Sequence, residues 1–72
     1  MECSERECIW LCTRGRTRLE CELFDRAGDC DLEIKRNSRL YGSYQFAGRE
    51  AALAFAGRLK ETFAANGWVA AA

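Results

Sequence analysis

Cysteine is the residue type in this chain with the widest range of chemistry, and five cysteines occur in 72 residues: Cys3, Cys8, Cys12, Cys21 and Cys30. Structural zinc sites commonly use Cys-x-x-Cys pairs and histidine, and this sequence contains neither. An odd number of cysteines also cannot form a complete set of intramolecular disulfides. We therefore expect reduced, mostly packed thiols and no bound metal. A metal or redox role and an intermolecular or partial disulfide remain open as alternatives.

Catalytic groups of other kinds are scarce. The chain has no histidine, and Gly15 and Gly28 are isolated turn glycines that do not form a phosphate-binding loop. A cysteine nucleophile needs a nearby base or positive charge to lower its pKa. Cys12, which the expected register places opposite Arg18, comes closest to meeting that need. The sequence therefore predicts no enzymatic activity and no cofactor.

Aromatic and cationic side chains are better candidates for function, because Trp, Tyr and Arg dominate the binding energy of protein interfaces. The residues that we expect to bind a partner are Trp10, Arg18, Lys35, Arg39 and Tyr41. This expectation holds only if the fold presents all five on one uncovered surface, which depends on the strands that carry them.

Alternation of apolar and polar residues predicts four strands, at residues 7–13, 16–25, 30–35 and 39–46. The short connections favour an antiparallel meander with loops at 14–16, 26–29 and 36–38. In this register one face carries Ile9, Leu11, Leu19, Cys21, Leu23, Cys30, Leu32, Ile34, Leu40, Gly42, Tyr44 and Phe46. The other face carries two cross-strand rows, Trp10–Glu20–Lys35–Arg39 and Cys8–Glu22–Glu33–Tyr41. Within the second row, Glu22 beside Glu33 is a like-charge pair that calls for a counterion.

The pattern changes to a helical period after Ala47, with Ala52, Phe55, Ala56, Leu59 and Phe63 on one face. This predicts a helix over residues 48–66 that Gly67 ends, with Trp68 packed back on Phe63. The expected fold class is α+β: a four-stranded antiparallel β-meander with one C-terminal α-helix packed on one face (ββββα). The whole chain, 1–72, forms one domain with a disordered N-terminus (1–6), the meander (7–46), the helix (48–66) and a tail (69–72). We expect Gly42 to let Phe55 or Phe63 approach its strand.

Composition narrows the classes of partner. Eleven basic and eleven acidic residues cancel, whereas a dedicated nucleic-acid binder normally has a basic excess. No apolar run is long enough to cross a membrane. The first seven residues are polar, unlike a secretory signal peptide. A cytoplasmic protein is therefore expected, with no membrane partner.

Two resemblances rest on the C-terminal half. Residues 39–46, 49–56 and 67–68 resemble short uncharacterised bacterial proteins in which a strand Arg-Leu-Tyr-x-Ser-Tyr-x-Phe leads into an Ala-rich helix ending in Gly-Trp. That resemblance implies no activity. The order of elements is similar to ethylene-response-type DNA-binding domains, to the arm-binding domains of phage integrases and to one repeat of Whirly- or PUR-type folds. The first two read DNA with the exposed sheet, which would place Arg16, Arg18, Lys35 and Arg39 on DNA.

Together these features predict a small non-enzymatic binding module that acts through its open sheet face. We expect a homodimer or the small partner or inhibitor of a larger protein, of bacterial or phage origin. The alternative is a nucleic-acid-binding domain that uses the same exposed sheet.

Overall fold

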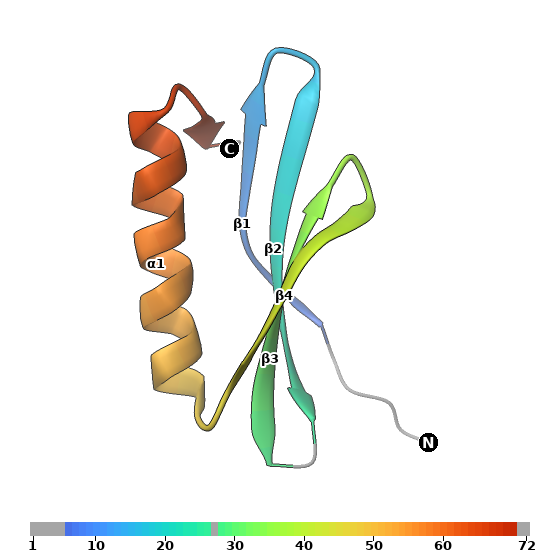
Figure 1. Ribbon diagram of the computed structural model, residues 1–72, viewed down its shortest axis with the longest axis vertical. Helices are drawn as coiled ribbons and strands as arrows, with labels where there is room; N and C mark the ends of the chain where they lie inside the picture. The colour runs from blue at the N-terminus through green and yellow to red at the C-terminus, as the bar shows by residue number, and fades with distance from the viewer. Residues whose placement is uncertain (1–5, 27, 71–72) are drawn as a thin grey trace.

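The described residues form a five-stranded antiparallel sheet with one helix on one face (Figure 1). The computed structural model describes residues 6–26 and 28–70. The elements, in chain order, are β1 (Glu7–Arg14), β2 (Thr17–Arg26), β3 (Asp29–Arg36), β4 (Arg39–Phe46), α1 (Arg49–Ala65) and β5 (Val69–Ala70). The order in the sheet is β4-β3-β2-β1-β5. The predicted α+β meander with a C-terminal helix is therefore confirmed, and a short fifth strand is added.

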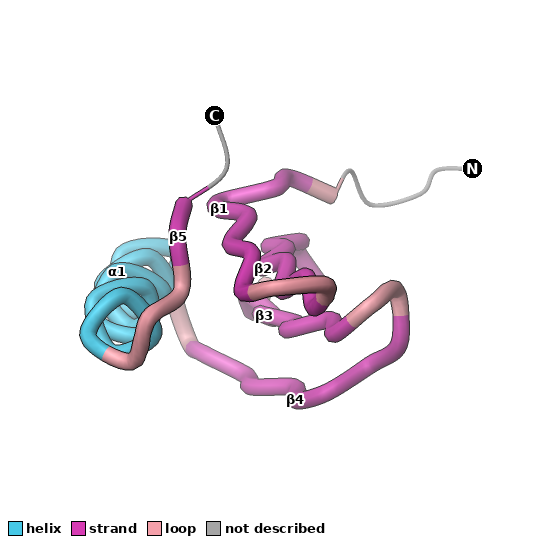
Figure 2. Tube along the Cα trace, turned by 90° about the horizontal axis from the view of Figure 1, so that it is seen from above, coloured by secondary structure: helices cyan, strands magenta, loops and turns pink. Residues whose placement is uncertain are grey.

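The core lies between the sheet and α1, which forms a second layer beside it (Figure 2). Alternate residues of β1, β2 and β3 face inward because strand side chains alternate between the two faces. From the helix, Ala52 and Ala56 are fully buried, and Phe55, Leu59 and Phe63 pack around them. Small residues at 52 and 56 allow the helix backbone to approach the sheet. The buried apolar residues are Trp10, Cys12, Leu19, Cys21, Leu23, Cys30, Leu32, Ile34, Ala52 and Ala56.

The predicted register of the first strand is wrong beyond Cys8. Cys8 pairs with Glu22 as expected, but the register then shifts by one residue and Trp10 pairs with Cys21. This β-bulge inserts Ile9, and such an extra residue exchanges the faces of all the residues that follow it. Trp10 and Cys12 consequently face the helix, and Leu11 faces away opposite Glu20.

All three predicted loops are longer than the turns observed. Arg26 pairs with Asp29, so the predicted loop at 26–29 is two residues too long. Arg14 pairs with Thr17, which leaves a two-residue turn at Gly15 and Arg16. Its φ of 61° at Gly15 is the conformation that a tight hairpin requires at its first central residue. The predicted loops at 14–16 and 36–38 are therefore each one residue too long.

The second tight turn, at Asn37 and Ser38, has positive φ at both residues, 51° and 71°, as in a type I′ hairpin. A second register shift follows it, because Lys35 pairs with Leu40 while Ile34 pairs with Gly42. Tyr41 is the extra residue. The shift restores the predicted inward direction of the rest of β4, and it leaves Leu40 61% exposed.

Gly42 accommodates a ring, but not the one expected. A Cβ atom at Gly42 would lie 3.3 Å from the hydroxyl of Tyr44 on the same strand. Phe55 instead packs on Tyr44 and Phe46, with ring centroids 4.8 and 5.3 Å apart. Phe55 therefore approaches β4 as predicted, but the ring nearest to Gly42 is that of Tyr44.

The helix ends as predicted. The amide of Gly67 donates to the carbonyl of Ala64 (3.2 Å) and that of Trp68 to the carbonyl of Phe63 (3.0 Å). This is a Schellman motif. The ring of Trp68 packs edge-on against that of Phe63, with ring centroids 6.0 Å apart. The turn directs the chain back to the sheet, where Val69 pairs with Thr13. The expectation of a tail at 69–72 is thus wrong for 69–70, while 71–72 lie outside the described residues.

Replacing Gly67 with alanine should lower the free energy of unfolding by about 1 kcal/mol, because Gly67 has φ of 93° and a Cβ atom disfavours that conformation. Urea unfolding monitored by tryptophan fluorescence measures this. Gly57→Ala provides the control, since Gly57 is exposed within the helix and an added methyl group would meet only open space. Alanine there should stabilise the fold by up to about 1 kcal/mol. Equal effects of the two variants would contradict the capping role of Gly67.

The predicted disordered N-terminus falls mostly on residues 1–5, which lie outside the described part of the chain together with Cys3. Arg6 is described, and it forms ion pairs with Glu22 and Glu33. These contacts connect Arg6, the described residue of this range, to the open face of the sheet. Within the described residues, α1 is neither long nor apolar enough to span a membrane.

Candidate partner-binding surface

Trp10, the first predicted anchor, is part of the core and does not lie on a binding surface. Its side chain is only 6% exposed, and its indole N–H donates to the carbonyl of Ala56 at 2.9 Å. The ring also meets Phe63 edge-on, with centroids 5.8 Å apart. The bulge at Ile9 is the cause, since it turns Trp10 from the open face toward the helix.

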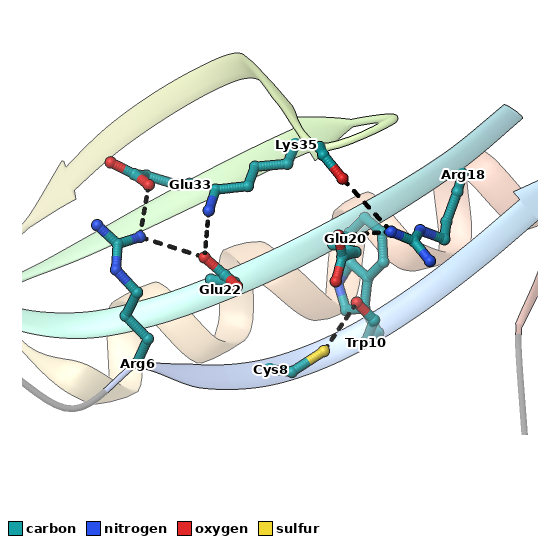
Figure 3. A network of polar contacts seen from close by, with 9 residues as sticks. Arg6, Cys8, Trp10, Arg18, Glu20, Glu22, Glu33 and Lys35 are labelled. Atoms are coloured by element: carbon teal, nitrogen blue, oxygen red, sulfur yellow. Dashed lines mark hydrogen bonds and ion pairs between the residues drawn. The ribbon is translucent and has the colours of Figure 1, made fainter.

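Arg18 and Lys35 do lie on the open face, and both are engaged there by carboxylates (Figure 3). The ammonium of Lys35 lies 3.1 Å from Glu22, and the guanidinium of Arg18 lies 3.6 Å from Glu20. The hydrogen bond from Lys35, supported by Arg6, holds the pKa of Glu22 below its usual value. These two cations already have partners within the molecule, which weakens them as donors to another one.

The counterion that the Glu22–Glu33 pair requires is Arg6. Glu22 and Glu33 face each other on β2 and β3, and one guanidinium nitrogen of Arg6 lies 3.2 Å from the first and 2.8 Å from the second. The Arg6 guanidinium also lies 4.4 Å from the ring centre of Phe24. The open face is thus a surface whose charges largely compensate one another.

Arg39 and Tyr41 have a different setting, on the outermost strand. β4 ends the sheet, and no described strand pairs with its outer side. Six of its eight residues are exposed, among them Leu40, Tyr41 and Tyr44 at 61%, 61% and 41%. We call this outer side of Arg39–Phe46 the β4 edge. Sequence reasoning placed Leu40 beneath the helix, and the structure exposes it. Tyr44 does face α1 as predicted and packs on Phe55, but it remains 41% exposed.

The described thiols show no activation. Cys12 lies opposite Leu19, not Arg18 as predicted, and burial raises its pKa. Partial burial, together with Glu20 and Glu22, also raises the pKa of the exposed Cys8. Burial and a hydrogen bond to Asp25 do the same for Cys30. A thiol needs the opposite shift to act as a nucleophile. Within residues 6–26 and 28–70, no three cysteine or carboxylate side chains gather as metal ligands would.

The chain matches no protein-family model, no curated protein and no solved structure. The resemblances drawn from the sequence therefore remain predictions.

Proposed function

We propose that this protein is a non-enzymatic interaction module that binds through the β4 edge, and that its partner is a second copy of the chain. The observation that carries the proposal is the state of β4. It is eight residues long, contains no proline, carries one charged residue, and exposes Leu40, Tyr41 and Tyr44. The outer side of an edge strand of this kind is a template for pairing with another chain.

The opposite edge of the sheet is less suited to pairing. β5 covers part of the outer side of β1, although it has only two residues. Natural sheets limit unwanted association through very short edge strands, and β5 is such a strand. Because β5 is so short and β4 is eight residues long, we expect a second copy to pair with β4.

Charge complementarity favours self-pairing. The segments 14–18 and 35–39 contain six basic residues and no acidic one, and β4 begins beside them. Asp25 and Asp29 flank the turn between β2 and β3 at the other end of the sheet, where β4 finishes opposite Cys30. Antiparallel pairing of two β4 strands would set the basic end of each copy beside the acidic end of the other.

Symmetry defines the centre of this interface. In an antiparallel pair related by a twofold axis, one residue faces its own copy, and side chains directly opposite share a face. Gly42 and Ser43 are the middle residues of β4. Leu40 and Tyr41 then lie within reach of Tyr44, Gln45 or Phe46 of the second copy.

Lysine at Ser43 should therefore abolish dimerisation without harming the fold. Two lysines would meet near the axis and repel each other. Within one copy, Ser43 is exposed and lies opposite Glu33, so the new charge has an acidic neighbour. Sedimentation equilibrium should give twice the 8.2 kDa monomer mass for the natural chain and the monomer mass for Ser43→Lys.

Thr62→Lys is the matched control, because it adds the same charge at an exposed position on the helix and should leave the dimer intact. A natural chain that stays monomeric at a concentration of hundreds of micromolar would overturn self-pairing. An unchanged dimer in Ser43→Lys would overturn the β4 edge as its interface.

We place the module in the cytoplasm, with reduced thiols. Cys12, Cys21 and Cys30 are buried apolar members of the core, and a reducing compartment keeps such thiols free.

A further inference from the structure

The two tight turns bring a strongly basic set of residues to one end of the sheet. The β1–β2 and β3–β4 turns lie at the same end, and the β2–β3 turn lies at the other (Figure 1). We call the segments 14–18 and 35–39 the basic end. Five of its six basic side chains are exposed: Arg14, Arg16, Arg18, Arg36 and Arg39.

Most of these cations have no acidic partner in the described structure. Lys35 is engaged by Glu22, and Arg18 lies 3.6 Å from Glu20. No ion pair joins Arg14, Arg16, Arg36 or Arg39 to any described carboxylate. The contrast with the compensated open face is clear, since four arginines here carry charge that the molecule itself does not neutralise.

Hydrogen bonds hold the two turns in a fixed relation. The amide of Asn37 donates to the carbonyl of Arg18, and the amide of Arg18 donates to the side-chain oxygen of Asn37, both at 2.9 Å. An open hollow lies between the turns, lined by Thr13, Gly15, Arg16, Thr17, Arg18, Asn37 and Ser38. Hydroxyl and guanidinium donors therefore surround a preorganised concave surface.

We propose that the basic end binds the phosphate backbone of a nucleic acid. In such complexes, phosphate oxygens accept hydrogen bonds from arginine guanidinium groups and from hydroxyl groups. The cations are spread over two turns instead of meeting at one point, which suits a chain of regularly spaced phosphates better than a single small anion. This site does not need the β4 pairing proposed above, and either can fail without the other.

The zero net charge does not prevent this binding. The described strands are eight to ten residues long, so roughly 25 Å separates the basic end from the acidic one. The Debye length at physiological ionic strength is about 8 Å. Within one copy, a phosphate at the basic end therefore experiences the nearby arginines far more than the distant aspartates of the same chain.

Fluorescence anisotropy with a 20-nucleotide single strand and a 20-base-pair duplex, titrated over sodium chloride, tests the proposal. Binding should weaken steeply with salt, with a log–log slope of about −3 to −4 for four neutralised phosphates. Arg16→Ala and Arg36→Ala should each weaken binding to every sequence alike and reduce the slope by about 1. The probe that binds more tightly, single strand or duplex, identifies the form of nucleic acid that the site prefers.

Arg58→Ala is the matched control, because Arg58 is an exposed arginine on the helix and its loss should leave affinity and slope unchanged. An equal effect of Arg58→Ala would overturn the site, as would no binding at 25 mM salt. Polyglutamate that binds as tightly as the oligonucleotides would also overturn it, in favour of an acidic protein. Folding of each variant is checked by its urea midpoint.

Discussion

Alanine in place of Trp10 is expected to lower the free energy of unfolding by about 3–5 kcal/mol, the usual cost of removing a large buried ring. The side chain is 6% exposed and contacts both the helix and the sheet. The whole free energy of unfolding of a small domain is about 5–15 kcal/mol. The variant should therefore unfold at far lower urea concentration, or not fold at 25 °C.

Trp10→Phe separates the contribution of the ring from that of its hydrogen bond. Phenylalanine keeps most of the packing but loses the donor to the carbonyl of Ala56, at a cost of about 1 kcal/mol. Urea unfolding monitored by circular dichroism measures both variants. If Trp10→Ala kept the natural midpoint and lost self-association instead, Trp10 would be a surface anchor and the bulge at Ile9 would be refuted.

The contrast between β1 and its neighbours shows what alternation can and cannot predict. In β2 and β3 every residue that alternation directs inward from Leu19 to Leu23 and from Cys30 to Ile34 is buried. β1 reads equally well with either face inward, because Cys8, Trp10 and Cys12 are as apolar as Ile9 and Leu11. Its bulge has no glycine to mark it. Only the gain from burying the indole against the helix decides the register, and that gain is a tertiary effect.

The charged residues also include contacts that the sequence predicts and contacts that it does not. The cross-strand pairs Glu20–Lys35 and Glu22–Glu33 follow from the sequence and are present. Arg6 as the shared counterion of Glu22 and Glu33 does not follow from the sequence, because it precedes the first strand. Net charge also conceals the separation of basic and acidic residues to opposite ends of the sheet. That separation depends on the placement of two turns, and each turn was predicted one residue too long.

Alkaline pH should destabilise the protein through Cys21, which is fully buried. Burial, with smaller effects of Cys8 and Glu22, raises the pKa of this thiol from 9.0 to about 12. The unfolded chain therefore releases the proton at lower pH than the folded one. The free energy of unfolding keeps its full value below pH 9 and falls by about 1.4 kcal/mol per pH unit between 9 and 12.

Comparing the natural chain with Cys21→Ala separates the contribution of this thiol from that of the rest of the molecule. Its stability advantage over Cys21→Ala should shrink by about 2 kcal/mol between pH 7.5 and 10.5, measured by urea unfolding under reductant. Ile34→Val changes the same core without removing a titrating group, so its difference should stay constant. A constant difference for Cys21→Ala as well would mean that the thiolate is accommodated in the folded state. Cys21 would then be accessible to water. That result would contradict its burial in the core between the sheet and α1, where it pairs with Trp10 and Ile34.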